Sequence, residues 1–318
     1  MPAAIRGDDM RVGIIGAGLA GVVAARELRA AGHEVVMVEK SRGLGGRLAA
    51  RRVGGTVVDH GAPVIEGGDD DGALARLLEQ LPADDRADLP EGTAYRSGAT
   101  RLAKLAADGL EVVLATRIAA LRPSGAGFEL AGEQGNTHGT VDAVIVTAPA
   151  PQAADLLEAS GADPARVAAL RAVAYHPAVM ILAGYAIPEP AGLDPFAVTP
   201  PFVRITNECA KSRPPVDGVV PVVARLTPEA SAVLLDAADA DILDRVLPAL
   251  NAAVGAAAEP AWVQVKRWRY ADPVAPADPS AVNPSGHRVR IAGDSIALGL
   301  AAVAESGRRA ARDLIGLQ

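Results

Sequence analysis

The sequence predicts an α/β fold in which a parallel-sheet domain, assembled from separated segments, accompanies a second domain of mixed α+β character. Three observations predict it. A strand–turn–helix–strand unit opens the chain at 11–40, and short apolar strands return at 142–151 and 289–294. Between them, the hydrophobic period switches between two and about 3.6 residues. The 318 residues are enough for two domains.

Composition narrows the class of protein. The net charge of −7 gives no basic footprint for nucleic acid, and the single cysteine, Cys209, excludes an intramolecular disulfide. The acidic run at 67–72 is expected to be a solvated loop, and no Cys–His spacing predicts a metal site. The N-terminus lacks a signal-peptide pattern and no apolar run could span a bilayer, so the protein is expected to be cytoplasmic.

The first unit carries a dinucleotide-binding pattern. Gly16, Gly18 and Gly21 form G-x-G-x-x-G between an apolar strand and a helix that ends near Gly32. The three glycines allow a tight turn, close approach of a pyrophosphate, and close packing of helix on strand. Glu39 ends the next strand, 23 residues after Gly16, where a ribose diol binds in this kind of fold. An NAD-dependent dehydrogenase using Glu39 remains an alternative.

A second glycine cluster favours a longer cofactor. Gly45 and Gly46 would let the chain approach phosphates and a ribityl chain, and Arg47 would pair with pyrophosphate charge. Gly61 and Ala62, in "DHGA", supply a third close approach. This arrangement is typical of a protein that binds extended FAD.

The motifs "GAGLAG", "EKSRGLGGRLAARR" and "DHGA", with "VKRWRYADP" and "AGDSIALGLAAVAESGRRAARDL", resemble the renalase-like flavoproteins, small relatives of the flavin amine oxidases. The resemblance spans nearly the whole chain. It implies non-covalent FAD, a Rossmann-type FAD-binding domain, and an inserted antiparallel-sheet substrate domain of the p-hydroxybenzoate-hydroxylase-like type. It also implies a set of cofactor-binding positions: Gly16, Ala17, Gly18, Leu19, Ala20, Glu39, Lys40, Gly45, Gly46, Arg47, Gly61, Ala62, Ile118, Thr147, Gly293, Asp294, Ala301 and Ala302.

The rest of the chain is assigned to these two domains. The FAD-binding domain is expected to comprise 1–65, 93–151 and 286–318, and the substrate domain 66–92 and 152–285. Near the end, Asp294 suits a ribityl hydroxyl, and amides at the start of the final helix, at Leu300, Ala301 and Ala302, would face the flavin's pyrimidine edge.

Three residues are candidates for the substrate pocket. Trp268 and Tyr270 alternate on one strand and therefore share a face, with a core pair as the alternative. Arg267 and Arg269 point the opposite way. His60 precedes Gly61 and is either near the cofactor or a structural histidine. No catalytic acid or base can be assigned.

The expected function is FAD-dependent oxidation, in which a small organic donor passes hydride to flavin N5 and oxygen reoxidises the flavin. A dihydronicotinamide or other cyclic, conjugated donor is favoured, because the chain has few aromatic residues with which to frame an amine. The alternatives are an amine oxidase, an oxidase of a biosynthetic intermediate, and a non-catalytic flavin- or nucleotide-binding protein. The partner is expected to be a small molecule, neither nucleic acid nor membrane.

Overall fold

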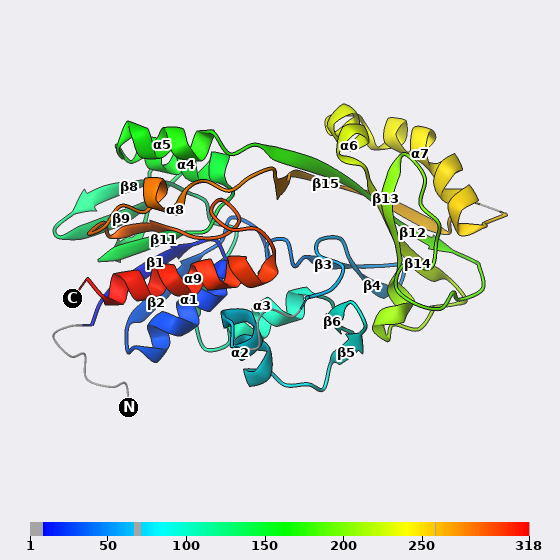
Figure 1. The fold of residues 1–318 in the computed structure, drawn as a ribbon, viewed down its shortest axis with the longest axis horizontal. Helices are drawn as coiled ribbons and strands as arrows, with labels where there is room; N and C mark the ends of the chain where they lie inside the picture. The colour runs from blue at the N-terminus through cyan, green and yellow to red at the C-terminus, as the bar shows by residue number, and fades with distance from the viewer. Residues whose placement is uncertain (1–8, 67–70, 258, 318) are drawn as a thin grey trace.

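A computed structural model describes residues 9–66, 71–257 and 259–317 (Figure 1). Most of the predicted acidic loop at 67–72, and the start of the chain, lie outside these residues. One half of the molecule, which contains both the start and the end of the described chain, is built on a parallel sheet in which β1 is central, as the short β-branched runs predict. In spatial order, its strands are β16 (Val289–Ile291), β11 (Ala143–Val146), β1 (Arg11–Ile15), β2 (Glu34–Val38) and β7 (Glu111–Val113).

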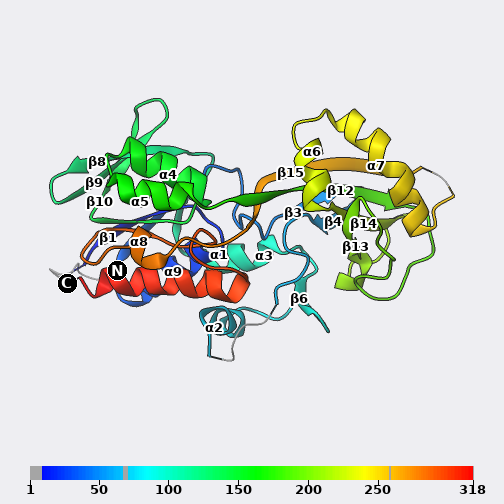
Figure 2. The same cartoon turned by 45° about the horizontal axis from the view of Figure 1, so that its top comes forward.

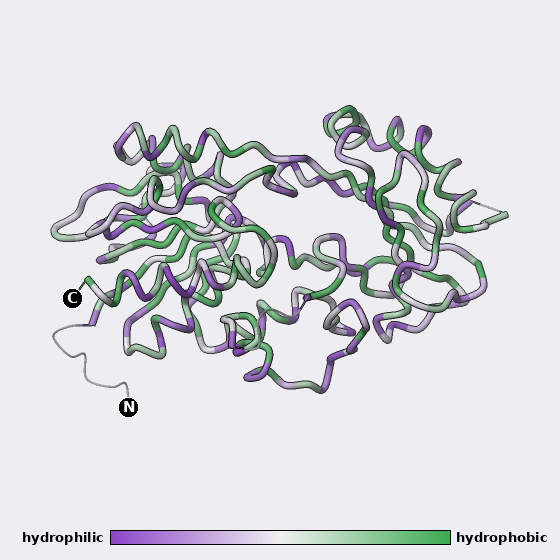
Figure 3. The backbone as a smooth tube through the Cα atoms, in the orientation of Figure 1, coloured by the Kyte–Doolittle hydropathy of each residue, from purple (hydrophilic) through white to green (hydrophobic). Residues whose placement is uncertain are grey.

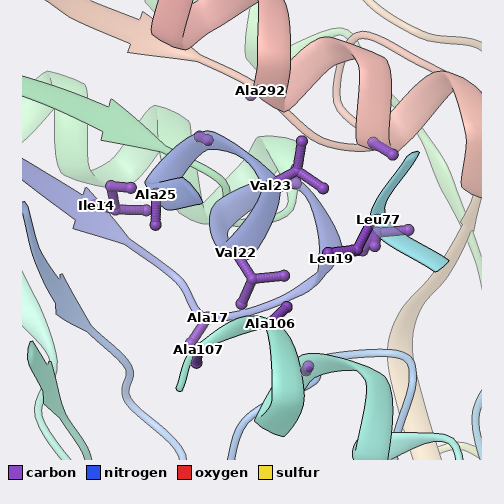
Figure 4. Packing of buried hydrophobic residues seen from close by; sticks show 14 of the residues in the cluster. Ile14, Ala17, Leu19, Val22, Val23, Ala25, Leu77, Ala106, Ala107 and Ala292 are labelled. Carbon is purple, nitrogen blue, oxygen red and sulfur yellow. The ribbon is translucent and has the colours of Figure 1, made fainter. Parts of the chain in front are cut away.

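Helices cover one face of this sheet. α1 (Leu19–Ala30) and α9 (Leu300–Ile315) lie together below it in Figure 1, beside α2 (Ala73–Gln80) and α3 (Thr100–Ala106). Their buried side chains form one cluster with the sheet, and Figure 4 shows Ile14, Val22 and Ala292 within it. The sequence is rich in small residues here, and α1 and α9 pack closely: a Cβ at Gly307 would lie 2.2 Å from the carbonyl oxygen of Ala20.

The opposite face is covered by a small antiparallel sheet and by helices. The sheet, in the order β10–β9–β8, shares a second cluster with the parallel strands. These covering elements are β8 (Ile118–Ser124), β9 (Gly127–Gly132), β10 (Thr137–Val141), α4 (Ala150–Ala159), α5 (Pro164–Arg171) and α8 (Pro279–Val282).

The second half is built on a four-stranded antiparallel sheet. Its order is β13 (Phe202–Asn207), β14 (Val220–Leu226), β12 (Tyr175–Tyr185) and β15 (Trp262–Pro273). One face packs against α6 (Pro228–Leu234) and α7 (Asp239–Val254). Figure 3 shows hydrophobic residues along the interior strands of both halves, and Figure 2 shows β12 and β15 running from one half to the other.

The other face of this sheet meets a hairpin that the sequence did not predict. β3 (Ala50–Val53) and β4 (Thr56–Asp59) pair antiparallel, and Val58 packs against Met180 and Trp268. A second short hairpin, β5 (Arg86–Leu89) and β6 (Gly92–Tyr95), and the 3-10 helix η1 (Glu208–Lys211) complete the described elements. Strands of four residues carry too little periodicity to be distinguished from loops.

The predicted α/β fold with a Rossmann-type domain is confirmed. We propose the expected two-domain division with one change: α2, α4, α5 and α8 belong with the parallel sheet, because their buried residues lie in its two clusters. Within the described residues, no helix has the length and apolar character needed to cross a membrane.

Candidate functional site

The turn after β1 leaves the start of α1 open to a ligand. The helix begins after Gly18, and no side chain in the described part of the chain caps its first amides. Gly21 cannot carry a side chain, because a Cβ there would lie 2.2 Å from the carbonyl oxygen of Gly16. Sequence spacing thus builds a turn whose backbone amides and helix dipole favour a phosphate.

Glu39 lies at the end of β2 beside this turn. Its side chain is 7% exposed, and its two oxygens accept the backbone N–H of Ala17 at 2.9 Å and of Ser41 at 2.8 Å. These bonds fix the carboxylate and leave further lone pairs on both oxygens. The carboxylate can therefore accept hydroxyl protons from a ribose, as the sequence predicts.

The second glycine cluster lies against the first. The N–H of Gly45 donates to the carbonyl oxygen of Ala17 at 2.8 Å, and a Cβ on Gly46 would come within 3.4 Å of the Gly18 Cα. Two segments 27 residues apart therefore meet backbone to backbone. Both loops therefore present glycine backbone to the cavity, which is the condition under which a ligand's phosphates can approach them closely.

Arg47, which is predicted to pair with pyrophosphate, also has partners within the protein. Its Nη1 donates to Asp294 Oδ2 at 2.5 Å and to the carbonyl oxygen of Ala271 at 3.0 Å. Within the described residues, its Nε and Nη2 make no hydrogen bond, so these atoms remain available to an anion. Asp294 is 4% exposed, and its Oδ1 has no partner among the described residues. This buried free oxygen fits a hydroxyl donor.

The "DHGA" segment is held by both halves of the molecule. The N–H of Ala62 donates to the carbonyl oxygen of Arg47 at 2.8 Å, and a Cβ at Gly61 would lie 1.9 Å from that oxygen. From the other side, Trp268 Nε1 donates to the carbonyl oxygen of His60 at 2.7 Å. The two rings stack with centroids 5.5 Å apart. The segment thus joins the parallel-sheet half to β15.

A cavity of about 1540 Å³ connects all these segments. It exceeds the volume of ordinary small-molecule sites, and therefore has room for an extended dinucleotide with a second molecule beside it. Most of the predicted cofactor residues line it, including Lys40, Ile118 and Thr147. Ala17, Ala301 and Ala302 do not; Ala17 and Ala301 pack in the core, and Leu300 lines the cavity at the start of α9.

The three predicted pocket residues, His60, Trp268 and Tyr270, also line the cavity. Arg267 and Arg269 also border the cavity, but their guanidinium groups pair with Asp239 at 2.6 Å and Asp236 at 2.5 Å. The alternation predicted for this strand would turn these two guanidinium groups away from the two aromatic rings.

His60 is neutral at physiological pH. Burial, followed by the charges of Lys266 and Arg51, lowers the pKa of His60 to about 4. Its Nδ1 is buried and has no partner in the described part of the chain. A neutral imidazole beside the cavity can stack and can donate or accept one hydrogen bond.

The sequence did not single out Arg51, Lys266, Met180 and Arg225, which also line the cavity. Lys266 precedes Trp268 by two residues and could have been found by the same alternation. Arg51 could not, because its hairpin was not predicted. Two residues with reactive side chains lie away from the cavity: His176 is exposed on β12, and Cys209 is buried among side chains of the antiparallel half. Burial, with Glu189 and Glu208, raises the pKa of the Cys209 thiol to about 12. No metal-ligand cluster occurs among the described residues.

Comparisons with known proteins agree with this geometry. Residues 14–81 match the family "NAD(P)-binding Rossmann-like domain", and residues 93–315 match "Flavin containing amine oxidoreductase". "Putative flavin-containing monoamine oxidase AofH" from Mycobacterium tuberculosis is 44% identical over 66 residues. That segment is 21% of this chain and only 14% of the relative's length.

Two solved structures share the fold. Wild-type putrescine oxidase bound to putrescine has a TM-score of 0.74 at 14% identity, with 97% of this chain and 99% of that chain covered. "Putative protoporphyrinogen oxidase" from Exiguobacterium sp. 255-15 has a TM-score of 0.71 at 15% identity, with coverage of 99% and 100%. At these identities, the likeness concerns the fold alone.

The fold and the cavity define a flavoprotein oxidoreductase. The chain belongs to the flavin containing amine oxidoreductase family, whose match covers well over half of its length. Its cofactor is non-covalent FAD. The residues fit this cofactor, because the close glycine loops, the carboxylate of Glu39 and the free Oδ1 of Asp294 all border one cavity.

Proposed function

We propose that the protein is a renalase-like FAD-dependent oxidoreductase that oxidises a small, cyclic, conjugated donor, with oxygen as the final acceptor. Bound FAD supplies the hydride acceptor and the path of electrons to oxygen. The protein supplies binding and orientation. On this proposal, the parallel-sheet half holds FAD through the predicted cofactor positions, and the antiparallel half is an inserted substrate domain of the p-hydroxybenzoate-hydroxylase-like type.

The observation that carries the proposal is the paired ring of Trp268 and His60. The stack stands at the junction between the cofactor loops and β15, with Ala178 and Met180 beside it on the neighbouring strand. A flat conjugated donor can lie against such a wall. The indole N–H fixes the wall to the His60 carbonyl, which orients the donor relative to the cofactor loops.

The protonation state of the site supports a dihydropyridine-type donor. Such a donor releases hydride without prior loss of a proton, because its ring nitrogen stabilises the cation that forms. A protonated amine must first lose a proton. His60, with a pKa of about 4, carries no proton to release at neutral pH and is a weak base. The cavity therefore suits a reaction that needs no strong base.

The amine-oxidase alternative has its support in family membership and in the fold shared with putrescine oxidase. An oxidase of a biosynthetic intermediate is supported by the similar fold of the Exiguobacterium protein. A non-catalytic binding protein accounts less well for a cavity that continues past the cofactor loops to the wall of β15.

The test is an absorbance spectrum of purified protein followed by anaerobic titration. NADH, NADPH, their dihydro isomers and putrescine would be added separately. Rapid bleaching of the flavin by a dihydronicotinamide would support the proposal. Bleaching by putrescine alone would establish the amine alternative, and turnover with none of a broad donor panel would favour a binding protein. A protein that takes up no flavin on reconstitution would contradict the cofactor assignment itself.

A further inference from the structure

Cationic side chains cross the wall of the cavity in one row. On the antiparallel sheet, Lys266 is paired with Met180, Met180 with Arg225, and Arg225 with Arg204. All four residues line the cavity. Arg51, on the hairpin strand β3, approaches the same wall and donates from Nη1 to Gln264 Oε1 at 2.9 Å. The donor end of the cavity is therefore positively charged.

Only part of this charge is balanced by the protein. Arg204 forms a bidentate ion pair with Asp194: its Nε donates to Oδ1 at 2.9 Å and its Nη2 to Oδ2 at 2.7 Å. Arg225 pairs with Asp272. Within the described residues, neither Lys266 nor Arg51 has a carboxylate partner. The Lys266 ammonium lies 5.1 Å from the centroid of the Trp268 ring, and Arg51 meets only the neutral amide of Gln264.

The acid nearest to Arg51 in the sequence, Asp59, does not compensate for these two cations. Asp59, beside His60, directs Oδ2 to Lys211 at 2.9 Å and to Arg213 at 2.8 Å, and its Oδ1 accepts the N–H of Ala99. It is thus fully used in the interior. Burial and then the charge of Arg51 lower the pKa of Lys266, which shows that the protein alone stabilises its ammonium poorly. An anionic ligand would remove this cost.

We propose that Lys266 and Arg51 bind an anionic group, a carboxylate or a phosphate, on the oxidised substrate. This inference rests on the proposed function, because it places the donor ring against Trp268. Residues 266 and 268 share a face of β15, and the Lys266 ammonium lies 5.1 Å from the centroid of the Trp268 ring. The anion should therefore lie next to the donor ring. A diamine would meet repulsion at the same place.

The test uses FAD-loaded protein and four ligands that share a phenyl ring: benzoate, phenyl phosphate, neutral benzamide and cationic benzylamine. Binding is read from the change in the flavin absorbance spectrum, which requires no turnover. We expect benzoate or phenyl phosphate to bind at least about 10-fold more tightly than benzamide, and benzylamine most weakly. The two anions distinguish carboxylate from phosphate as the preferred group.

Variants assign the effect to residues. Lys266→Met and Arg51→Gln should each weaken binding of the preferred anion by about 10- to 100-fold and leave benzamide binding unchanged. Arg245→Gln, which removes an exposed cation from α7 in the same half, is the matched control. Flavin content should be equal in all variants.

Three results would overturn the proposal: benzamide or benzylamine binding as tightly as the anions, no perturbation by either anion up to tens of millimolar, or equal affinity in the Lys266 and Arg51 variants. Failure of the proposed function looks different. In that case the anions would still bind through Lys266 and Arg51, while no dihydronicotinamide would bleach the flavin.

Discussion

Arg47 and Asp294, 247 residues apart in the sequence, are joined by a 2.5 Å contact between Nη1 and Oδ2. The pair ties the second glycine loop to the end of the last parallel strand, and the second oxygen of Asp294 remains without a partner among the described residues. One carboxylate therefore serves two purposes: it fixes the arginine, and it presents an acceptor to the cofactor cavity.

Asp294→Asn should weaken FAD binding by about 10-fold or more. The substitution removes the negative charge that orients Arg47, and it replaces one of the two acceptor oxygens by an NH₂ group, which can only donate. The dissociation constant can be measured by quenching of flavin fluorescence. Asp313→Asn, on the exposed side of α9, is the control and should leave that constant unchanged. Unaltered affinity in Asp294→Asn would exclude this residue from the cofactor site.

Substitutions of glycine by alanine should distinguish a glycine that FAD binding requires from a glycine that the fold requires. At Gly18, an added Cβ would meet its nearest atom at 3.9 Å, so the fold should persist while the space for pyrophosphate is lost. At Gly21, the Cβ would lie 2.2 Å from a carbonyl oxygen, so the turn itself should be destabilised.

Thermal unfolding and FAD content would be measured for both variants. Gly18→Ala should retain its melting temperature without FAD but bind FAD at least about 10-fold more weakly, whereas Gly21→Ala should melt earlier. Gly316→Ala is the control, because a Cβ there would meet its nearest atom at 3.5 Å and this residue does not line the cavity. Full FAD affinity in Gly18→Ala would show that the phosphates do not pass there.

Asp59 belongs to a buried group of four charges with Glu208, Lys211 and Arg213. Asp59→Asn should lower the free energy of unfolding by about 3–5 kcal/mol, because it leaves the buried cations partly uncompensated. Glu158→Gln breaks an exposed pair with Arg171 and should leave the free energy of unfolding nearly unchanged, because solvent screens that pair.

The same four buried charges predict that the free energy of unfolding depends on pH in the acid range. Burial alone would raise the pKa of Asp59, but Lys211 and Arg213 hold that pKa below its usual value of 3.8. The stabilisation is therefore complete above the unfolded-state pKa and is lost as pH falls below about 4. Urea unfolding between pH 3 and 6 should show this loss in the natural protein and a smaller one in Asp59→Asn. An equal dependence of the free energy of unfolding on pH in the two proteins would refute the lowered pKa of Asp59.

Protonation of His60 should change the free energy of unfolding at a higher pH than protonation of Asp59. Because its pKa is about 4 in the native state and about 6.5 when unfolded, only the unfolded state takes up this proton between those values. Stability should therefore fall as pH drops from 6.5 to 4, by up to about 3 kcal/mol. Urea unfolding of His60→Gln should show a flatter profile there, and exposed His287→Gln should not. An unchanged profile in His60→Gln would contradict the low pKa.

Local signals made much of the site predictable. The spacing of Gly16, Gly18 and Gly21, and the position of Glu39, follow from rules for one turn and one strand, and in the structure Glu39 accepts the N–H of Ala17 within that turn. Trp268 and Tyr270 on one face follow from strand alternation. The partner of Arg47 did not follow, because Asp294 enters through contacts across 247 residues.

The sequence by itself determined the α/β class, the dinucleotide turn and the cofactor, since each depends on residues close together in the chain. Only the tertiary structure decided which charges line the cavity beyond the cofactor loops. The β3 hairpin brings Arg51 to the wall of β15, while Asp59 is turned into the interior by Lys211 and Arg213. Which charges remain unbalanced in a cavity depends on long-range packing, and this balance points to an acidic substrate.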